Sequence, residues 1–600
     1  MPVMEPLPVS DPIRVSDPVP VMDFAPVPST GAARPGSRLG PAAAGRCRRR
    51  IHLDADPAAD RSRRRRVDDG TRHRWADAEL HRREVVARLI TALDPVIGGA
   101  PDPADPFRPA VLAPELLAPA RSGAPDLLLW AGDGYVPVLL RNHRTTDPGA
   151  GAVVAPLSDP LGVSVSPLRR PRSQPADLWA LAHHYRQLSD LGLAAGRARG
   201  AVLGRGPVGP LDRAPGTDGK PADGVTDGDR LLWHELPAGL LAEYDARFAD
   251  RSAVAAAAAA GAPALAEPSQ IGECRRCPWW PICSVELTAR DDVSLVAPGS
   301  DADVLRAAGL ATVAGLAAAP APVLAALELP GISPVAIRTR ARARAAGTPL
   351  VRRTAQVRIP RADVELDVDM ESYLDDGAYL WGTLLSGPGL ARLDLAPGYR
   401  PFVTWRPLPD ADEGRAFGAF WTHLIGVREQ ARVAGLSFAA YCYSRQAEEG
   451  WMRSAPVRFA GTPGVPTAAA VAAFCAGPEW IDLYQLVRDQ YVVTGSLRLK
   501  ALAPLAGFAW RDPDPGGENS MAWYRGAIGA DGPAQPRLAA RVLEYNEDDV
   551  RATLALRRYL GESAVELPTV ADLDRRWPAD GSPDDRSVSA AASAAIRPAG

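Results

Sequence analysis

Residues 364–371, VELDVDME, alternate apolar and acidic side chains over eight positions. Strict alternation predicts a β-strand with one buried face. Because side chains two residues apart point to the same side of a strand, Asp369 and Glu371 share a face. Like charges on one face are costly unless a cation lies between them. The stretch therefore predicts a strand that carries half of a divalent-metal site.

Outward from this strand, the pattern predicts further strands at 379–385 and 437–443 and helices at 413–433, 466–475 and 537–560. Strands that alternate with helices over some two hundred residues are typical of an α/β layer fold. We expect this domain to span residues 355–565.

More acidic residues follow downstream. In residues 543–550, LEYNEDDV, Tyr545 and Asp549 are four apart and share one helix face. Glu448 ends residues 441–448, YCYSRQAE, and Asp482 lies in residues 480–483, WIDL. The order is Asp-x-Glu, a middle acid, then Tyr-x-x-x-Asp. The alternative is an exposed strand and a solvated helix end without chemistry.

This order resembles the DEDD superfamily of 3′-to-5′ exonucleases on a ribonuclease H-like fold, and the surrounding residues, including 496–500, SLRLK, resemble its YprB-type branch. The resemblance implies two Mg²⁺ or Mn²⁺ ions about 4 Å apart that act on a scissile phosphate. It implies that Asp369, Glu371 and Asp549 hold the metals and that Tyr545 orients the attacking water. Glu448 is then the middle acid, with Asp482 in reserve.

A second feature is the cysteine cluster in residues 272–284, GECRRCPWWPICS, which contains Cys274, Cys277 and Cys283. Three cysteines so close together are typical of metal ligands. A closed site needs four ligands, and the best candidate for the fourth is Cys47. A metal held in this way makes residues 45–290 one folded unit. Within it the pattern predicts a β-hairpin from the apolar runs at 125–130 and 135–143, helices at 75–93, 175–198 and 239–261, and a loop at 204–229.

The spacing of one distant cysteine followed by Cys-x-x-Cys-x5-Cys resembles the iron–sulfur staple of RecB-like nucleases of the AddB kind. The resemblance implies a [4Fe-4S] cluster that pins the ends of a restriction-endonuclease-type α/β domain of the PD-(D/E)xK class. Zinc in the same ligands is the alternative. The other cysteines, Cys442 and Cys475, lie among apolar residues and are expected to be packed thiols.

The nuclease centre that this class requires is eroded. Asp126 fits the first acid, but Arg141 stands where a lysine is needed, and arginine is a poor base. The helix that usually carries Gln and Tyr retains only Tyr185. We expect this domain to have lost or weakened its own cleavage and to bind nucleic acid instead. The arginines and histidine expected to do so are Arg63, Arg64, Arg65, Arg66, Arg141 and His143, with a solvated, partly mobile face as the alternative for the run at 63–66.

The remaining segments lie before, between and after these two domains. Residues 1–44 and 578–600 have the composition of disordered tails. Residues 291–350 contain short helices punctuated by glycine, which resemble a helix-hairpin-helix pair, with a plain helical linker as the alternative. The net charge is only −3, and no apolar run is typical of a membrane span or a cleavable signal, so we expect a cytoplasmic protein.

Together these observations predict an α/β multidomain, metal-dependent nuclease, most simply a 3′-to-5′ exonuclease that acts on single-stranded ends in DNA repair. Its partner is nucleic acid, and since no Gly-x-x-x-x-Gly-Lys-Ser/Thr loop is present, any unwinding requires a partner helicase. Two alternatives stay open: a non-catalytic nucleic-acid-binding scaffold and an RNA-processing exoribonuclease.

Overall fold

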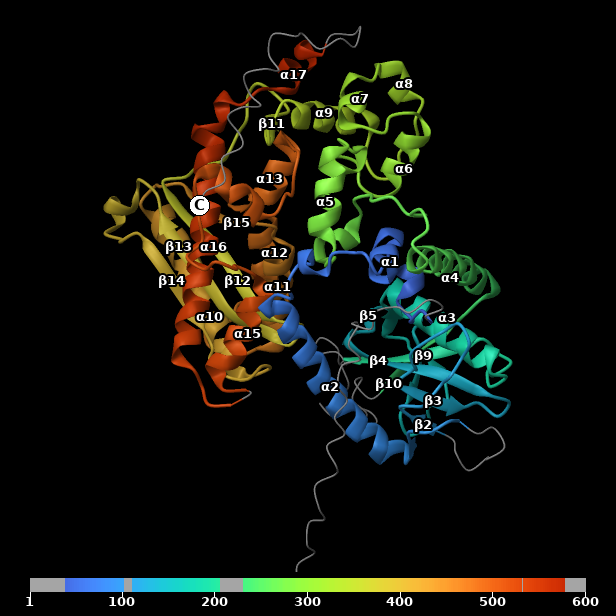
Figure 1. Ribbon diagram of the computed structural model, residues 1–600. Helices are drawn as coiled ribbons and strands as arrows, with labels where there is room; N and C mark the ends of the chain where they lie inside the picture. The colour runs from blue at the N-terminus through green and yellow to red at the C-terminus, as the bar shows by residue number, and fades with distance from the viewer. Residues whose placement is uncertain (1–37, 102–109, 206–229, 531, 578–600) are drawn as a thin grey trace, which may run out of the picture.

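The computed structural model describes residues 38–101, 110–205, 230–530 and 532–577. Figure 1 shows an N-terminal lobe (residues 38–289), a helical segment (290–349) and a C-terminal lobe (350–577), each lobe built on its own sheet. The predicted tails at 1–37 and 578–600 and most of the predicted loop at 204–229 lie outside the described residues. No helix within the described ranges is both long enough and apolar enough to cross a membrane.

The N-terminal lobe contains a mixed sheet with the strand order β1-β2-β3-β4-β9-β10-β6-β7. Its central pair, β4 and β9, is parallel, as are β1 and β2, and the other neighbours are antiparallel. A separate ribbon pairs β5 with β8. The strands are β1 (Val96–Ile97), β2 (Ala110–Leu112), β3 (Leu127–Trp130), β4 (Tyr135–Arg144), β5 (Thr146–Pro148), β6 (Val153–Pro156), β7 (Ser164–Val165), β8 (Arg169–Pro171), β9 (Arg199–Arg205) and β10 (Arg230–Glu235).

Helices cover both faces of this sheet. On one face, Val85 and Leu89 of α2 (Asp69–Leu93) pack against β3, β4 and β9. On the other, α3 (Pro175–Asp190) and α4 (Ala238–Ala259) pack on Leu139 and Val202 together with α1 (Arg48–Ala55). The long helix α2 runs from this lobe to the C-terminal lobe (Figure 1).

Two boundaries differ from the prediction. The predicted tail ends earlier, because Ala43 and Ala44 are buried against α3 and α4 and Leu39 donates its N–H to the Ala120 carbonyl. The helix predicted over 175–198 ends at Asp190, because Gly192 has a φ of 69° and the chain then pairs with Tyr135 on the way to β9.

After α5 (Trp280–Ala289), the helical segment contains α6 (Ser300–Ala307), α7 (Val313–Ala318), α8 (Ala321–Ala325) and α9 (Pro334–Ala345). Side chains cap two of these helices, since Thr312 accepts from the Gly315 N–H and Ser333 from the Ala336 N–H. The helices share an apolar core of their own. The chain's last described helix, α17 (Val570–Arg576), packs beside α9.

The C-terminal lobe contains a five-stranded sheet with the order β14-β13-β12-β15-β16. Only β13 runs against the others, since β12 is parallel to β15, β15 to β16, and β13 is antiparallel to both neighbours. A short ribbon pairs β11 with β17. The strands are β11 (Leu350–Arg352), β12 (Val364–Tyr373), β13 (Gly377–Ser386), β14 (Gly398–Val403), β15 (Phe438–Cys442), β16 (Trp480–Asp482) and β17 (Tyr491–Val493).

The apolar side chains of β12 pack on one helix layer, and its acids face another. Val364, Leu366 and Val368 belong to the core formed with α10 (Ala411–Val433), α11 (Gln446–Arg458) and α12 (Ala468–Ala476). The opposite face is covered by α16 (Pro536–Glu562) and, at its end, α15 (Gly517–Ile528). Two shorter helices, α13 (Leu483–Gln490) and α14 (Leu499–Leu502), complete the lobe. Every strand and helix predicted here is present, and the pattern missed the shorter elements β11, β14, β16, β17, α11, α13, α14 and α15.

Candidate active site

Four acids follow one another at every second position of β12, and all four face α16. The first two, Glu365 and Asp367, are fully buried and are matched by Arg557 of α16. Its guanidinium donates to Asp367 Oδ1 and Oδ2 at 2.9 Å and to Glu365 Oε2 at 2.7 Å. This half of the acidic face is a closed ion pair and holds the helix on the sheet.

The second two acids, Asp369 and Glu371, face Asp549 instead of an arginine. One carboxylate oxygen from each of the three lies within 4.8 Å of the others, and within the described part of the chain this is the only group of three or more His, Cys, Asp or Glu side chains that does so. Burial, and then the charge of Asp549, raise the pKa of Glu371 to about 8 and that of Asp369 well above its usual value. These three carboxylates, two of them buried and that of Asp369 half-buried, form an oxygen donor set for a hard divalent cation such as Mg²⁺ or Mn²⁺.

Neighbouring side chains fix two of the three carboxylates. Asn546 donates from Nδ2 to Asp369 Oδ2 at 2.8 Å, and Trp510 donates from Nε1 to Asp549 Oδ1 at 2.7 Å. Gly382 lies opposite Asp369 on β13, and a Cβ there would lie 1.6 Å from Asn546 Oδ1. The glycine therefore makes room for the amide that orients Asp369.

Glu448 lies in the first turn of α11 and is only 4% exposed. Its Oε2 has no hydrogen-bond partner among the described residues. Burial raises the pKa of Glu448 to about 8, and the charges of Asp482 and Glu371 add to this. An unpartnered buried carboxylate beside Glu371 fits the middle acid of the predicted order.

Asp482, the reserve candidate, has another task. It caps α13 by accepting from the Gln485 N–H at 3.3 Å, and it also accepts from the Ser444 N–H at 3.0 Å. Ser444 has a φ of 71°, a strained conformation for a residue other than glycine, at the turn that leads from β15 into α11. Asp482 thus holds the turn that directs Glu448 inward.

Tyr545 lies one helical turn before Asp549 and is 3% exposed. Lys500 donates from Nζ to the Tyr545 hydroxyl at 2.5 Å and lies 3.5 Å from Asp549 Oδ2. No role was predicted for Lys500, although the sequence offered a signal: it contains only two lysines, and the other is Lys220. Asn546, Trp510 and Gly382 were also missed.

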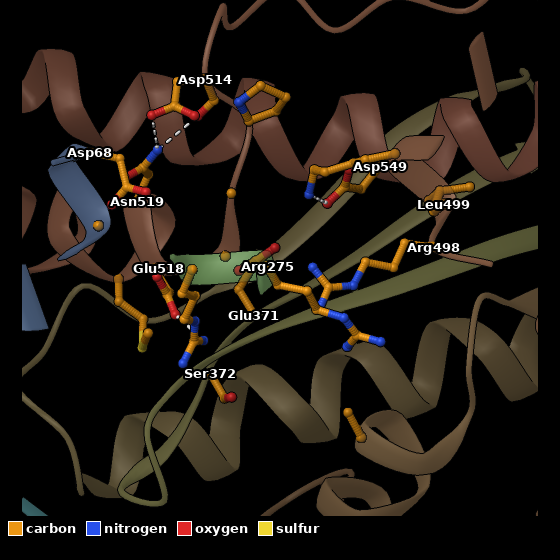
Figure 2. Close-up of a pocket in the computed structure, with 18 of the residues that line it drawn as sticks. Asp68, Arg275, Glu371, Ser372, Arg498, Leu499, Asp514, Glu518, Asn519 and Asp549 are labelled. Carbon is orange, nitrogen blue, oxygen red and sulfur yellow. Dashed lines mark hydrogen bonds and ion pairs between the residues drawn. The ribbon is translucent and has the colours of Figure 1, made fainter. Parts of the chain in front are cut away.

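A cleft of about 1210 Å³ joins this acid group to the N-terminal lobe. Figure 2 shows Glu371 and Asp549 of the C-terminal lobe together with Arg275 of the N-terminal lobe around this cleft. Among the residues that line it are Arg46, Arg50, Gly272, Arg275 and Arg276 from the N-terminal lobe and Asp369, Glu371, Arg498, Lys500 and Asp549 from the C-terminal lobe.

The four predicted cysteine ligands line one small cavity of about 10 Å³. Cys47 precedes α1, Cys274 lies in the 3-10 helix η5 (Gly272–Arg276), Cys277 follows it, and Cys283 lies in α5. Glu273 joins the two ends by accepting from the Cys47 N–H at 2.7 Å and from Arg50 at 2.9 Å.

The sulfur spacing bears on which metal fits. Tetrahedral zinc with Zn–S bonds of about 2.3 Å would bring the sulfurs to about 3.8 Å from one another. Within the described chain, no three of these sulfurs lie within 4.8 Å of each other. The sulfurs are therefore further apart than a tetrahedral zinc site requires.

The residues of the N-terminal lobe that were predicted to form a degenerate nuclease centre are held in hydrogen bonds and ion pairs. Asp126 accepts from the Leu140 N–H at 2.6 Å and pairs with Arg82. Arg141 donates to Asp177 at 2.7 Å, and His143 lies 3.1 Å from the same carboxylate. The Tyr185 hydroxyl donates to the Ala195 carbonyl at 3.0 Å.

The predicted nucleic-acid-binding residues have other partners in this structure. Arg141 and His143 share the Asp177 carboxylate. Of the arginine run, Arg64 lies over the Trp279 ring at 5.0 Å, and Arg65 donates to the Arg275 carbonyl at 2.7 Å. These two contacts join the run to the cysteine segment, while Arg63, Arg65 and Arg66 are exposed. Nucleic-acid binding by these residues stays a prediction.

The comparisons with known proteins bear on the C-terminal lobe. A family model of the RNase_H superfamily matches residues 467–561. The C-terminal region contains a ribonuclease H-like domain. The matched residues include Lys500, Tyr545 and Asp549, while Asp369 and Glu371 precede them. No curated protein and no solved structure matches the chain.

A ribonuclease H-like domain indicates a nuclease-type function, nucleic acid as the partner and divalent metal ions as cofactors, in accord with the acid group. The ribonuclease H-like part of the prediction is confirmed. The RecB-like identity of the N-terminal lobe, the YprB-type branch and the domain boundaries stay predictions.

Proposed function

We propose that this protein is a metal-dependent 3′-to-5′ exonuclease that acts on single-stranded nucleic acid ends, with DNA repair or processing as its setting. The observation that carries the proposal is the group of three carboxylates, Asp369, Glu371 and Asp549, which line a cleft beside the ribonuclease H-like domain.

The ligands in this proposal are Asp369, Glu371 and Asp549, with Glu448 as the fourth acid. Two Mg²⁺ or Mn²⁺ ions bound there would activate water and stabilise the leaving oxygen of a scissile phosphate. Tyr545 orients the attacking water, and Lys500 holds the Tyr545 hydroxyl in place. Asn546 and Trp510 keep two ligands in position before any ion binds, which lowers the cost of assembling the site.

The test compares Asp369→Ala and Asp549→Ala with the unmodified protein and with Glu544→Ala, which removes an exposed acid from the same helix. We expect both site variants to lose cleavage of single-stranded DNA and RNA in Mn²⁺ while they still bind these strands. Glu544→Ala should cleave normally. Full activity in both site variants would contradict the proposed function.

For the N-terminal lobe we propose a RecB-like fold that no longer cleaves, stapled by a [4Fe-4S] cluster on Cys47, Cys274, Cys277 and Cys283. The support is the shared cavity and the wide sulfur spacing. Anaerobically purified protein should contain about four iron atoms per chain. Cys47→Ser should lower the iron content, while Cys475→Ser, in the other lobe, should not. Stoichiometric zinc without iron would replace the cluster by a zinc site.

A further inference from the structure

The cleft that ends at the acid group has walls from two distant parts of the chain. Its volume of about 1210 Å³ exceeds the range of about 300–1,000 Å³ that is typical of small-molecule sites. One part of its lining is η5, which contains Cys274 and ends before Cys277, and another is the segment that leads into α14. Such a space suits a short run of nucleotides better than one mononucleotide.

The charges in this cleft are unevenly matched. Arg46 and Arg50 pair with Glu273, and Arg276 pairs with Glu518. The side chains of Arg275 and Arg498 form no hydrogen bond or ion pair with any residue in the described part of the chain, and both are exposed. Both side chains line the cleft, Arg275 from η5 and Arg498 from the segment that leads into α14 (Figure 2).

The other acids of the cleft are already occupied. Glu518 pairs with Arg74 and Arg276, Asp514 accepts from Asn519, and Asp68 caps α2. None of them neutralises the two free guanidinium groups. Two unmatched arginines from the two lobes, leading to a group of carboxylates, are arranged for a chain of phosphates whose end lies at those carboxylates.

We propose that Arg275 and Arg498 bind successive backbone phosphates of the strand upstream of its 3′ end, so that the cysteine-bearing segment of the N-terminal lobe forms half of the substrate cleft of the ribonuclease H-like domain. The inference rests on the proposed function and adds to it a substrate class: a single strand several nucleotides long.

The position of this wall depends on the cysteine segment. Arg65 holds the carbonyl of Arg275 at 2.7 Å, and Cys274 and Cys277 flank that residue. Glu518, at the start of α15, is bound by Arg276 of η5 and by Arg74 of α2. The cysteine segment is thereby joined directly to the domain that holds the acid group, which assigns the metal-binding cysteines a role in substrate binding.

Binding tests the inference without cleavage. The affinity of a labelled single strand of about 12 nucleotides for the Asp549→Ala protein is measured by fluorescence anisotropy over a series of salt concentrations. Each lost phosphate contact should reduce the slope of log affinity against log salt by about one. We therefore expect the added double substitution Arg275→Ala/Arg498→Ala to reduce the slope by about two. The matched control, Arg197→Ala/Arg432→Ala, removes two exposed arginines outside the cleft and should not change it.

Cleavage provides the second arm. With Asp549 intact, the double substitution should lower kcat/KM on the long strand at least about tenfold relative to a dinucleotide, since only the long strand reaches both arginines. The inference would be overturned if the double substitution changed neither the salt slope nor the ratio of kcat/KM on the long strand to kcat/KM on the dinucleotide. The proposed function would still stand in that case. If the unmodified protein degrades neither substrate, the proposed function fails, and the salt slope alone decides whether the cleft binds the strand.

Discussion

At the scale of single residues, the acidic face of β12 is divided by the source of its counter-charge. Glu365 and Asp367 form ion pairs with Arg557, so their counter-charge is a side chain of the protein itself. Among the described residues, no arginine or lysine forms an ion pair with Asp369 or Glu371. The nearest cation to their neighbour Asp549 is Lys500, at 3.5 Å. Burying carboxylates without a partner is costly, so this half of the face depends on an external cation.

The first prediction separates the two candidates for the middle acid. Glu448→Gln keeps the shape but removes the charge from a buried site beside Glu371, so we expect kcat to fall by about two orders of magnitude with little change in binding. Asp482→Ala removes the cap of α13 and should lower the free energy of unfolding by about 1 kcal/mol with a smaller loss of kcat. The opposite ranking in kcat would make Asp482 the fourth acid.

The second prediction concerns the residue opposite Asp369. Gly382→Ala would place a methyl group on the Asn546 amide, displace it from Asp369 and lower metal-dependent cleavage at least about tenfold. Gly426→Ala is the matched control, because this glycine lies inside α10 with open space around its Cβ position. It should raise the free energy of unfolding by up to about 1 kcal/mol and leave cleavage intact. Normal activity in Gly382→Ala would show that Asn546 is dispensable.

At the scale of elements, helix α3 buries a neutral histidine in the N-terminal lobe. The Tyr244 hydroxyl lies 2.9 Å from His183 Nδ1, and Nε2 donates to the Ser122 carbonyl at 3.0 Å. Burial, and then the nearby His184, lower the pKa of His183 to about 3. Below its ordinary value of about 6.5 the unfolded chain binds this proton and the folded chain does not, so stability falls as the pH falls.

The third prediction follows from that sign. Because folded His183 stays neutral, the free energy of unfolding should fall by about 2 kcal/mol as the pH is lowered from about 7 to about 5. His183→Gln should therefore lose less stability over this interval than the unmodified protein, as measured by urea unfolding. Equal losses in the two proteins would show that His183 is not the group that titrates.

Local patterns predicted the elements of the site but not their partners. Alternation over β12 and the four-residue spacing on α16 were enough to predict which side chains share a face. The pairing of Arg557 with Asp367 joins residues 190 apart, and no local pattern encodes such a contact. Likewise, the eight strands of the N-terminal sheet are mostly short and their order depends on non-local pairing, so only the hairpin of β3 and β4 was predicted.

At the scale of the whole molecule, a buried polar contact joins the two lobes beside the active site. Asp77 of α2 accepts from the Tyr373 hydroxyl at 2.6 Å, and Tyr373 ends the strand that carries Asp369 and Glu371. Asp77 also accepts from Asn142 and Arg205 of the N-terminal sheet at 2.9 and 3.0 Å. The orientation of the lobes, and with it the cleft, depends on this carboxylate.

The fourth prediction tests this coupling. Tyr373→Phe removes one hydroxyl and leaves the buried Asp77 short of a donor, which should cost about 1–3 kcal/mol at the contact between the lobes. We expect calorimetry to show two unfolding transitions whose temperatures lie further apart in the variant than in the unmodified protein. Tyr484→Phe, a tyrosine away from this contact, is the control. Identical profiles for Tyr373→Phe and the unmodified protein would show that the lobes are held together by other contacts.

The central claim is that the carboxylate group in the C-terminal lobe removes nucleotides from a 3′ end. The most direct measurement is degradation of 5′-labelled single-stranded DNA and RNA by anaerobically purified protein in Mg²⁺ or Mn²⁺, beside Asp549→Ala. The account predicts a ladder of labelled products that shortens from the 3′ end and is absent with the variant. The polymer that is degraded faster, DNA or RNA, is the preferred substrate. Tight binding of both polymers without any cleavage would contradict it and leave a nucleic-acid-binding scaffold.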